Sequence, residues 1–394
     1  MGFSTSRPAK RLLLLVMVSM FSMTGGCKEG PWQLWNSYAA RFIDQQSGRV
    51  FDPSGGQRST SEGQAYALFF SLAANDRAGF ERILGWTQDN LAAGDLAAHL
   101  PAWLWGKNND GQWTVLDANP ASDADVWMAY TLLEAGRLWK SNADTRLGRA
   151  LLALIAKKEV VDLPGFGPML VPGPSGFQQG TNWILNPSYL PVFLFERLAN
   201  YDAAGTWGQI AQGIPRLLAE SSPHGYAMDW IEYTPGDGFS AALKPGTASA
   251  GDPGSVAPVG SYDAIRVYMW AGMIEPHDPL RQRILDAVPG MSGYLANHDA
   301  PPEKVGDQGV PLAQDGPVGF SAAVLPYLRS YPDFSRAYAR QLVRLNAQKD
   351  ATSGLYGKDV AYYDQNLTLF AAGFLDSRFR FGRGGELNVE WKRR

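Results

Sequence analysis

Three carboxyl residues, Glu62, Asp123 and Asp263, each stand near the start of an apolar segment with helical character. Such a position has a purely structural explanation, because a carboxylate is favoured electrostatically near a helix N-terminus. The Ser61-x-x-Gln64 spacing around Glu62 is also that of a capping box. All three residues occupy this position, however, and that repetition suggests a second interpretation. The three carboxyl groups could act together in one reaction, provided that the fold brings them close to one another.

Two carboxyl groups in different protonation states can hydrolyse a glycosidic bond. One protonates the departing oxygen, while the other activates water or attacks carbon. The proton donor needs a raised pKa, which a partly apolar, enclosed setting supplies. Glu62 fits this role, since Tyr66 and Phe69 follow it on the same segment. Asp263 fits the role of the base, because Arg266 follows at a spacing that allows a helical ion pair and favours an ionised carboxylate.

Other catalytic patterns are absent from the sequence. The four histidines show no metal-ligand spacing, and no Gly-x-Ser-x-Gly, phosphate-binding or dinucleotide-binding pattern occurs. We therefore expect no metal and no cofactor. The formal charge is −3, and residues 1–26 carry three basic and no acidic residues, so the remainder sits at −3 − 3 = −6. This balance favours a neutral substrate and argues against nucleic acid.

Helical periodicity recurs along the chain in two kinds of segment. One kind is apolar on a single face, as where Phe80, Ile83, Leu84 and Leu91 recur at helical spacing. The other kind is apolar nearly all round, as in VWMAYTLLEAG and AIRVYMWAGM, and such a helix must be buried on every side. The predicted helices lie at 32–45, 61–74, 77–91, 122–140, 145–160, 187–200, 203–220, 261–274, 278–297, 320–330, 333–348 and 361–376.

The two kinds of helix alternate along the chain, which predicts buried inner helices paired with amphipathic outer helices. The expected fold is all-α, an (α/α)6 barrel of six inner and six outer helices, in a single domain over residues 27–394. A helical solenoid and a two-domain α-helical protein are the competing architectures. The sequence shows no repeat of the kind that a solenoid requires.

The inner helices of such a barrel all begin at one end, so Glu62, Asp123 and Asp263 are expected to converge there. Long connections at 92–121, 162–186 and 221–260 add material to the same end, and a short β-hairpin is expected within 226–243. These connections carry the aromatic residues Trp103, Trp105, Trp113, Trp183, Tyr226, Trp230 and Tyr233.

The first 26 residues have the pattern of an export signal, with basic residues up to Arg11, an apolar run over 12–23 and small residues after it. The apolar run is too short for a stable membrane anchor. Cys27, the single cysteine, follows Gly-Gly, so lipid attachment at Cys27 and ordinary cleavage nearby both stay open. Membrane attachment is expected only if Cys27 is lipidated. We expect a monomer located in the periplasm.

Several long stretches of the chain resemble glycoside hydrolase family 8, in particular its branch of periplasmic endoglucanases encoded beside bacterial cellulose synthase. The stretches are TSEGQAYALFFSLAANDRAGF, LPAWLWG, ASDADVWMAYTLLEAGRLW, NPSYLPVF, SYDAIRVYMWAGM, PPEKV and GPVGFSAAVLP. The resemblance spans about residues 30–380. It implies an (α/α)6 barrel and an inverting mechanism.

By this resemblance Glu62 is the general acid, Asp263 is the general base that activates water, and Asp123 grips and distorts the central sugar. A nucleophilic role for Asp123 is the alternative, but inversion forms no covalent intermediate. Inversion also predicts a separation of about 6.5–9.5 Å between the acid and base carboxyl groups. The residues expected to line the sugar sites are Trp103, Tyr189, Tyr262, Arg266 and Tyr363.

These observations predict an endo-β-1,4-glucanase that acts on β-1,4-glucan and accompanies bacterial cellulose biosynthesis; association with a cellulose synthase complex is left open. One alternative is a hydrolase of the same family that acts on mixed-linkage glucan, xylan or chitosan. Another is a non-catalytic glucan-binding or assembly factor on the same fold. A polysaccharide lyase is a third, and it would need a Tyr, His or Arg base.

Overall fold

The computed structural model describes Gly2 and residues 32–222, 224–246 and 257–392. The predicted export signal, apart from Gly2, and Cys27 lie outside the described residues. Residues Trp32–Arg394 form one compact unit.

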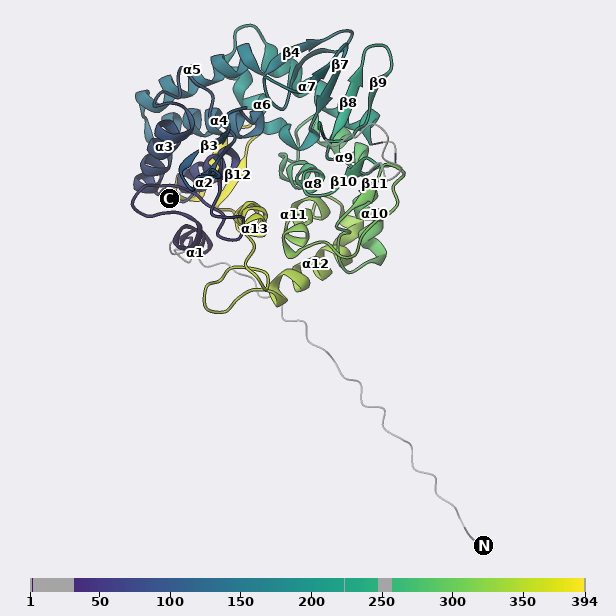
Figure 1. Cartoon of the computed structure of the whole chain (residues 1–394). Helices are drawn as coiled ribbons and strands as arrows, with labels where there is room; N and C mark the ends of the chain where they lie inside the picture. The colour runs from purple at the N-terminus through teal and green to yellow at the C-terminus, as the bar shows by residue number, and fades with distance from the viewer. Residues whose placement is uncertain (1, 3–31, 223, 247–256, 393–394) are drawn as a thin grey trace. The chain divides into compact units, whose positions relative to one another are not determined.

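Helices dominate this unit, and its described residues contain thirteen α-helices. They are α1 (Gln33–Phe42), α2 (Ser61–Ala73), α3 (Arg77–Leu91), α4 (Ser122–Trp139), α5 (Asn142–Lys158), α6 (Val192–Leu198), α7 (Thr206–Ser221), α8 (Ala264–Met273), α9 (Arg281–Ala287), α10 (Gly290–Asn297), α11 (Val318–Leu328), α12 (Ser335–Ala347) and α13 (Tyr362–Leu375). In Figure 1, helices α2, α4, α8, α11 and α13 surround the centre of the unit, while α1, α3, α5 and α12 lie outside them.

The predicted alternation of inner and outer helices is confirmed. Helices α2, α4, α6, α8, α11 and α13 are buried nearly all round, and α9 and α10 together take the place of one outer helix. Neighbouring inner helices pack against one another around the ring. Phe370 of α13 closes the ring against α2, with ring centroids 5.6 Å from Phe69 and 4.5 Å from Phe70. The fold is the expected (α/α)6 barrel.

The start of α2 differs from the capping box that the sequence suggested. Thr60, rather than Ser61, caps the helix, and its Oγ1 accepts a hydrogen bond from the Gly63 N–H at 3.1 Å. The Gln64 side chain instead accepts from the Val50 N–H at 2.6 Å. The capping-box interpretation is therefore wrong, and Glu62 lies in the first turn with no capping role.

Two predicted helices are interrupted. The prediction of one helix over 278–297 is wrong, because α9 ends at Ala287 and α10 begins after Pro289, which has no N–H to continue a helix. The segment predicted over 187–200 starts with the short 3-10 turn Pro187–Tyr189, and α6 follows it. Each break lies where a proline stands in the sequence.

Short β-strands occupy the connections between helices. They are β1 (Ser59–Thr60), β2 (Leu104–Lys107), β3 (Trp113–Asp117), β4 (Val160–Leu163), β5 (Gly167–Leu170), β6 (Gln178–Gln179), β7 (Asn182–Leu185), β8 (Ile231–Thr234), β9 (Gly238–Ala241), β10 (Val259–Gly260), β11 (Val305–Gly306), β12 (Phe379–Phe381) and β13 (Leu387–Val389). The hairpin expected within 226–243 is present as β8 and β9, and β7 and β6 extend it to four strands. The other hairpins, including β2–β3, were not predicted.

Strands β1–β11 all lie in connections that lead into an inner helix. They therefore surround the end of the barrel where the inner helices begin, which we call the rim. The hairpin β12–β13 follows α13 and lies at the opposite end, which we call the base. Phe381 of β12 stacks on Phe193 of α6 with ring centroids 3.8 Å apart, so the C-terminal hairpin fills the barrel interior from the base.

The base is held by one buried carboxylate. Glu134 of α4 is 0% exposed and accepts hydrogen bonds from the Leu387 N–H at 2.8 Å and from Arg197 Nε at 2.6 Å. Arg137 donates to the same carboxylate. Glu134 follows Asp123 by eleven residues on α4, which separates base from rim by about 16 Å.

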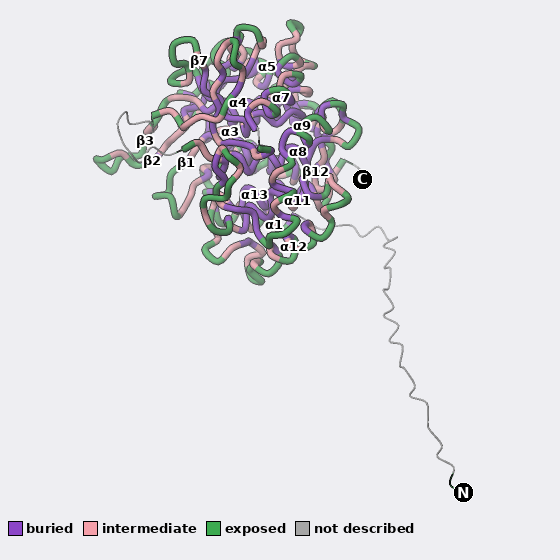
Figure 2. Tube along the Cα trace, turned by 90° about the vertical axis from the view of Figure 1, so that its right-hand side faces the viewer, coloured by how far each residue is buried: buried purple, intermediate pink, exposed green. Residues whose placement is uncertain are grey.

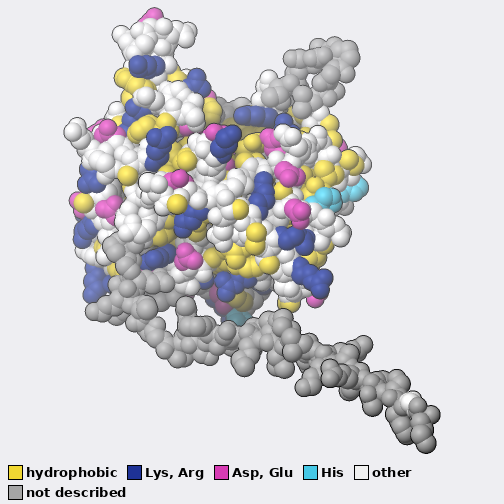
Figure 3. Space-filling model, turned by 90° about the horizontal axis from the view of Figure 1, so that it is seen from below, with side chains coloured by type: hydrophobic (Ala, Val, Ile, Leu, Met, Phe, Trp, Pro, Cys, Tyr) yellow, Lys and Arg dark blue, Asp and Glu magenta, His cyan; other side chains and the backbone are white. Residues whose placement is uncertain are grey.

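No helix among the described residues is long and apolar enough to cross a membrane. Burial is concentrated on the helices inside the unit, drawn in purple in Figure 2, and the exposed residues, drawn in green, lie at its periphery. Figure 3 shows basic and acidic side chains intermixed on the face seen from below, with no large field of one sign. A surface of that kind does not select a charged polymer.

Candidate active site

Four segments of the chain meet at Arg266 of α8. Its guanidinium donates to Asp263 Oδ1 at 2.7 Å and to Asp123 Oδ2 at 3.3 Å. It also donates to the hydroxyls of Tyr66 and Ser188, both at 2.9 Å. Residues up to 200 apart in sequence therefore converge at the rim, as the arrangement of inner helices predicts.

Arg266 is 6% exposed, so its charge is almost fully removed from water. A buried guanidinium is tolerated only when it is paired with carboxylates and its N–H groups are hydrogen-bonded. Asp123 and Asp263 supply the charge, and the two hydroxyls satisfy further donors. The arginine thereby fixes the relative positions of two of the three predicted carboxyl groups.

Glu62 reaches the same region from the first turn of α2. The indole Nε1–H of Trp103 donates to Glu62 Oε1 at 3.0 Å. Burial raises the pKa of Glu62; hydrogen bonds, among them that of Trp103, and the charge of Arg266 only partly oppose this effect. A carboxyl group that keeps its proton above the usual pH is suited to act as a general acid.

Asp263 stands directly before α8, in a turn that Asp229 organises. Asp229 Oδ1 accepts three backbone hydrogen bonds, from Ser261 at 2.7 Å, from Asp263 at 3.1 Å and from Ala264 at 2.8 Å. Burial, followed by the charge of Asp263, raises the pKa of Asp229 to about 6. Asp229 holds the backbone on both sides of Asp263, and the sequence analysis did not identify it.

Asp123 lies deeper than the other two carboxyl groups and is 2% exposed. Its Oδ1 accepts from the Ala124 N–H at 2.8 Å, and its Oδ2 faces Arg266. Burial, followed by the charge of Glu62, raises the pKa of Asp123. The influence of Glu62 on this pKa indicates that the two carboxyl groups are close enough to affect one another's protonation.

A cavity of about 270 Å³ opens over these residues. Its lining consists of Glu62, Trp103, Asp117, Asn119, Pro120, Ala121, Pro172, Phe177, Tyr189, Trp230, Lys244 and Asp263. The predicted acid and base thus share one cavity with two of the predicted sugar-site residues. Phe177 and Trp230 add a parallel aromatic pair with ring centroids 5.9 Å apart. Flat aromatic faces beside carboxyl groups suit a ligand built of sugar rings.

The remaining predicted sugar-site residues lie beside or beneath this cavity. Tyr262 is 42% exposed, and its ring centroid is 5.6 Å from that of Tyr363, whose hydroxyl donates to the Tyr262 carbonyl. Both tyrosines adjoin Asp263 and neither lines the cavity itself. Arg266 lies beneath, with its guanidinium 5.8 Å from the ring centroid of Tyr189.

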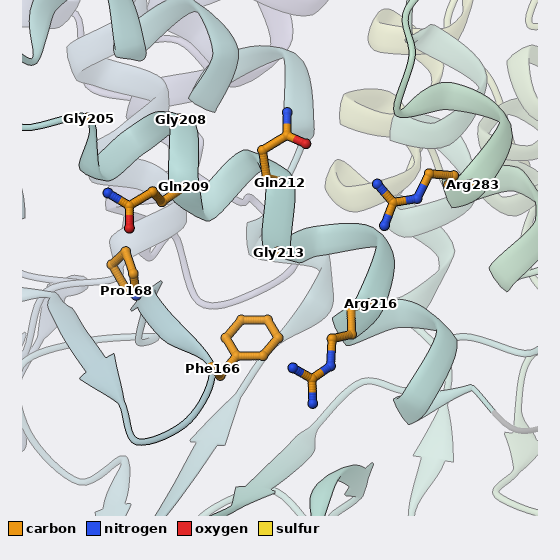
Figure 4. Close-up of a pocket in the computed structure, with 9 residues that line it drawn as sticks. All are labelled: Phe166, Pro168, Gly205, Gly208, Gln209, Gln212, Gly213, Arg216 and Arg283. Atoms are coloured by element: carbon orange, nitrogen blue, oxygen red, sulfur yellow. The ribbon is translucent and has the colours of Figure 1, made fainter.

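A larger hollow of about 680 Å³ lies elsewhere, between α7, the β4–β5 hairpin and α9 (Figure 4). It is lined by Phe166, Pro168, Gly205, Gly208, Gln209, Gln212, Gly213, Arg216 and Arg283. No carboxyl group and no histidine is among these residues. It therefore offers neither the acid nor the base that hydrolysis needs, and size alone does not mark the reactive site.

Sequence analysis missed three parts of the site. Asp229 lies in a connection where no local pattern distinguishes it from other aspartates. Phe177 follows a glycine-rich turn, and nothing in the sequence places it beside Trp230. Trp230 was recognised only as one of several rim aromatics. Its position immediately before the β8–β9 hairpin, within an unusually long connection, was the available signal.

An (α/α)6 barrel with carboxyl groups and aromatic side chains at one cavity on its rim is an arrangement suited to a glycoside hydrolase. The chain belongs to glycosyl hydrolases family 8, whose family model matches residues 5–376. The family predicted from the resemblance is confirmed.

Known relatives agree with this assignment. The chain is 44% identical to an endoglucanase of Escherichia coli O157:H7 over 382 residues, which is 96% of each chain. It is also 44% identical to an endoglucanase of Xanthomonas axonopodis pv. citri (strain 306) over 366 residues, covering 92% of this chain and 90% of the relative. The crystal structure of an endo-1,4-D-glucanase from Vibrio fischeri ES114 superposes with a TM-score of 0.81 at 36% identity, covering 92% of this chain and 99% of that one.

Proposed function

We propose that this chain is an endo-β-1,4-glucanase that cleaves internal bonds of cellulose-type glucan with inversion. The observation that carries the proposal is the shared cavity of Glu62 and Asp263, one carboxyl group with a raised pKa and one paired with a buried arginine. Two endoglucanases that match nearly the whole chain, together with the endo-1,4-D-glucanase of Vibrio fischeri, support β-1,4-glucan as the substrate.

In the proposed reaction Glu62 is the protonated partner. Its proton passes to the glycosidic oxygen as the bond to the anomeric carbon breaks, so the departing chain leaves as an alcohol. Trp103 donates to Oε1 at 3.0 Å, whereas the Ser61 hydroxyl contacts Oε2 at the longer distance of 3.5 Å, so Oε2 is the proposed oxygen that carries this proton. After turnover Glu62 takes up a proton from water.

Asp263 is the proposed base. Its carboxylate removes a proton from a water molecule, and the resulting oxygen attacks the anomeric carbon from the face opposite the departing group. Arg266 and the turn built by Asp229 hold this carboxylate in place. Asp123, deeper in the site and bound to the same arginine, is the proposed grip on the central sugar.

Hydrolysis of carboxymethyl-cellulose tests this proposal when viscosity and reducing ends are followed together. Wild type should lower viscosity early, before many reducing ends accumulate. Glu62→Gln and Asp263→Asn should each lower kcat by about 10²–10⁴-fold while remaining folded. Glu81→Gln is the matched control, because Glu81 is exposed and far from the cavity in an ion pair with Arg77.

Two outcomes would contradict the proposal. Near-normal activity of either variant would remove that residue from its proposed role. Faster cleavage of mixed-linkage glucan, xylan or chitosan than of β-1,4-glucan would reassign the substrate. Proton NMR of the first product separates the mechanisms, since inversion yields the α-anomer at the new reducing end.

The proposed setting is the periplasm, during bacterial cellulose biosynthesis, where the enzyme would trim or release glucan. The export-signal pattern of residues 1–26 supports export. Mass spectrometry of the mature N-terminus tests it. Cleavage before Cys27 with added acyl mass would indicate a lipid anchor, cleavage without added mass would indicate a free periplasmic enzyme, and an intact leader would contradict export.

A further inference from the structure

The β2–β3 hairpin carries an exposed tryptophan outside the catalytic cavity. Trp113 is 39% exposed, and the other tryptophans of the described residues are buried or half-buried. The hairpin projects from the body of the unit in Figure 2, beside the labels β2 and β3. A single exposed apolar ring is ordinary on a protein surface, so the case for a binding site depends on the groups that surround Trp113.

The ring of Trp113 is held in a fixed orientation. Trp105 stacks on it with ring centroids 4.8 Å apart and planes 8° apart, and Trp86 supports Trp105 edge-on at 5.2 Å. The guanidinium of Arg49 lies 4.3 Å from the Trp113 ring centroid, and Arg49 is itself held by the Ser59 hydroxyl at 2.9 Å. A ligand that stacks here loses little entropy to ordering the protein.

The platform of Trp105 and Trp113 continues the sheet that builds the catalytic cavity. Trp103, which donates to Glu62, comes immediately before β2. The other edge of β2 pairs with β1, which leads directly into α2 and Glu62. Trp113 is paired with Lys107, four residues beyond Trp103, so it lies about 13 Å farther along the strand.

At that distance Trp113 lies outside the cavity. It stands beside one end of β2, and the cavity residue Trp103 stands at the other end. A sugar bound between Glu62 and Asp263 cannot reach Trp113, whereas later units of the same polymer can. The groups around the ring suit a neutral polyhydroxylated chain. The part of the indole ring that Trp105, Arg49 and Lys107 leave exposed can accept the apolar face of a sugar ring, and Lys107, with Nζ 5.1 Å from the Trp113 ring centroid, can donate to hydroxyl groups.

We propose that Trp113, supported by Trp105 and Arg49, is a remote binding site for β-glucan that engages units of the polymer outside the hydrolytic cavity. The inference rests on the proposed glucanase function for the identity of the ligand. The site contributes to holding long chains and contributes nothing to the chemical step. Polymers should therefore depend on Trp113, and short cello-oligosaccharides should not.

Binding is measured by affinity electrophoresis of the full chain in gels that contain hydroxyethyl-cellulose, in the Glu62→Gln background so that the polymer is not cut. Trp113→Ala should weaken retardation by about two- to tenfold, the range expected for loss of one aromatic stacking contact. Trp113→Tyr should restore most of the binding. Val343→Ala is the control, because Val343 is 69% exposed on the outer helix α12.

Hydrolysis assays separate this inference from the proposed function. With an intact Glu62, Trp113→Ala should cleave a short cello-oligosaccharide at the wild-type rate and show a raised KM on long soluble polymer. Unchanged retardation of Trp113→Ala, in an enzyme whose wild type cleaves β-glucan, would overturn the remote site alone. Failure of wild type to cleave any β-glucan would instead overturn the proposed function.

Discussion

Two clusters of buried charge, around Arg266 at the rim and around Glu134 at the base, are paired in opposite ways. At the rim, one guanidinium, that of Arg266, is paired with two carboxyl groups while Glu62 lies close by, so three carboxyl groups share one guanidinium. At the base, one carboxylate, that of Glu134, accepts hydrogen bonds from two guanidiniums and a backbone N–H. Glu134 is therefore fully paired, whereas Glu62 and Asp123 at the rim have raised pKa values.

This difference shows that reactivity at the rim comes with a loss of stability. A carboxyl group with every lone pair occupied by a donor is a good structural anchor and a poor proton donor. Glu62 retains its proton because it is buried with too few partners. We expect the rim to be a source of local instability that the base offsets, in line with the trade-off between activity and stability at active sites.

The largest expected effect is the loss of the base carboxylate. Glu134→Gln should lower the free energy of unfolding by about 3–5 kcal/mol, because it leaves Arg137 and Arg197 beside a neutral amide. Urea denaturation measures this loss. Glu220→Gln is the control, since its ion pair with Arg216 is largely exposed and is worth about 0–1 kcal/mol.

Removal of the crowded rim charge should have the opposite sign. Glu62→Gln should raise the free energy of unfolding by about 0.5–2 kcal/mol while abolishing most activity. The pKa of Glu62 is raised in the fold, so the native state loses stability as pH rises through that pKa. The gain from the amide should therefore be larger at pH 8 than at pH 5. If Glu62→Gln destabilised the protein as much as Glu134→Gln does, the proposed difference between rim and base would be refuted.

The pH profile of kcat/KM sharpens the assignment of Glu62. Activity should fall on the alkaline side as Glu62 loses its proton, above the usual range for a glutamate. The Trp103 hydrogen bond lowers the pKa of Glu62, so Trp103→Phe should move this alkaline limb to higher pH. It should also reduce kcat/KM by about two- to tenfold, the value of one hydrogen bond. If the alkaline limb of the profile does not move in Trp103→Phe, the loss of activity at high pH belongs to a group other than Glu62.

The smallest expected effect concerns a neutral contact at the base. The Tyr130 hydroxyl donates to the Gly385 carbonyl at 2.9 Å and helps to hold the C-terminal hairpin. Tyr130→Phe should cost about 0.5–1.5 kcal/mol of stability without changing kcat. Thermal unfolding beside Glu134→Gln measures the difference, and a loss as large as that of Glu134→Gln would show that charge is not what distinguishes the base.

The helices were largely predictable because their cause is local. Phe80, Ile83 and Leu91 recur at helical spacing in α3, and the segments that became inner helices were apolar on all sides. The capping of α2 by Thr60 rather than Ser61 was missed, since neighbouring hydroxyl residues offer the same chemistry one position apart. The break at Pro289 was overlooked, although proline itself was the signal.

The strands and part of the site were less predictable because their causes are distant. The β2–β3 hairpin did have a local signal, the Asp110-Gly111 turn between alternating apolar residues, which was not used. The role of Asp229 had none, because it depends on three N–H groups more than thirty residues away. The carboxyl groups could be predicted because acid–base hydrolysis requires carboxyl residues. The residues that support them, such as Asp229, could not, because only the fold determines which side chain lies in the supporting position.

The C-terminal hairpin has a consequence for the order of assembly. Phe381 of β12 completes the aromatic interior of the barrel, and the Leu387 N–H of β13 donates a hydrogen bond to Glu134. Both strands follow all the helices of the barrel in the sequence. A ribosome releases the inner helices long before these strands. We expect the nascent protein to remain an open, incompletely packed ring until β12 and β13 emerge, which would delay its compaction and would be compatible with the proposed export.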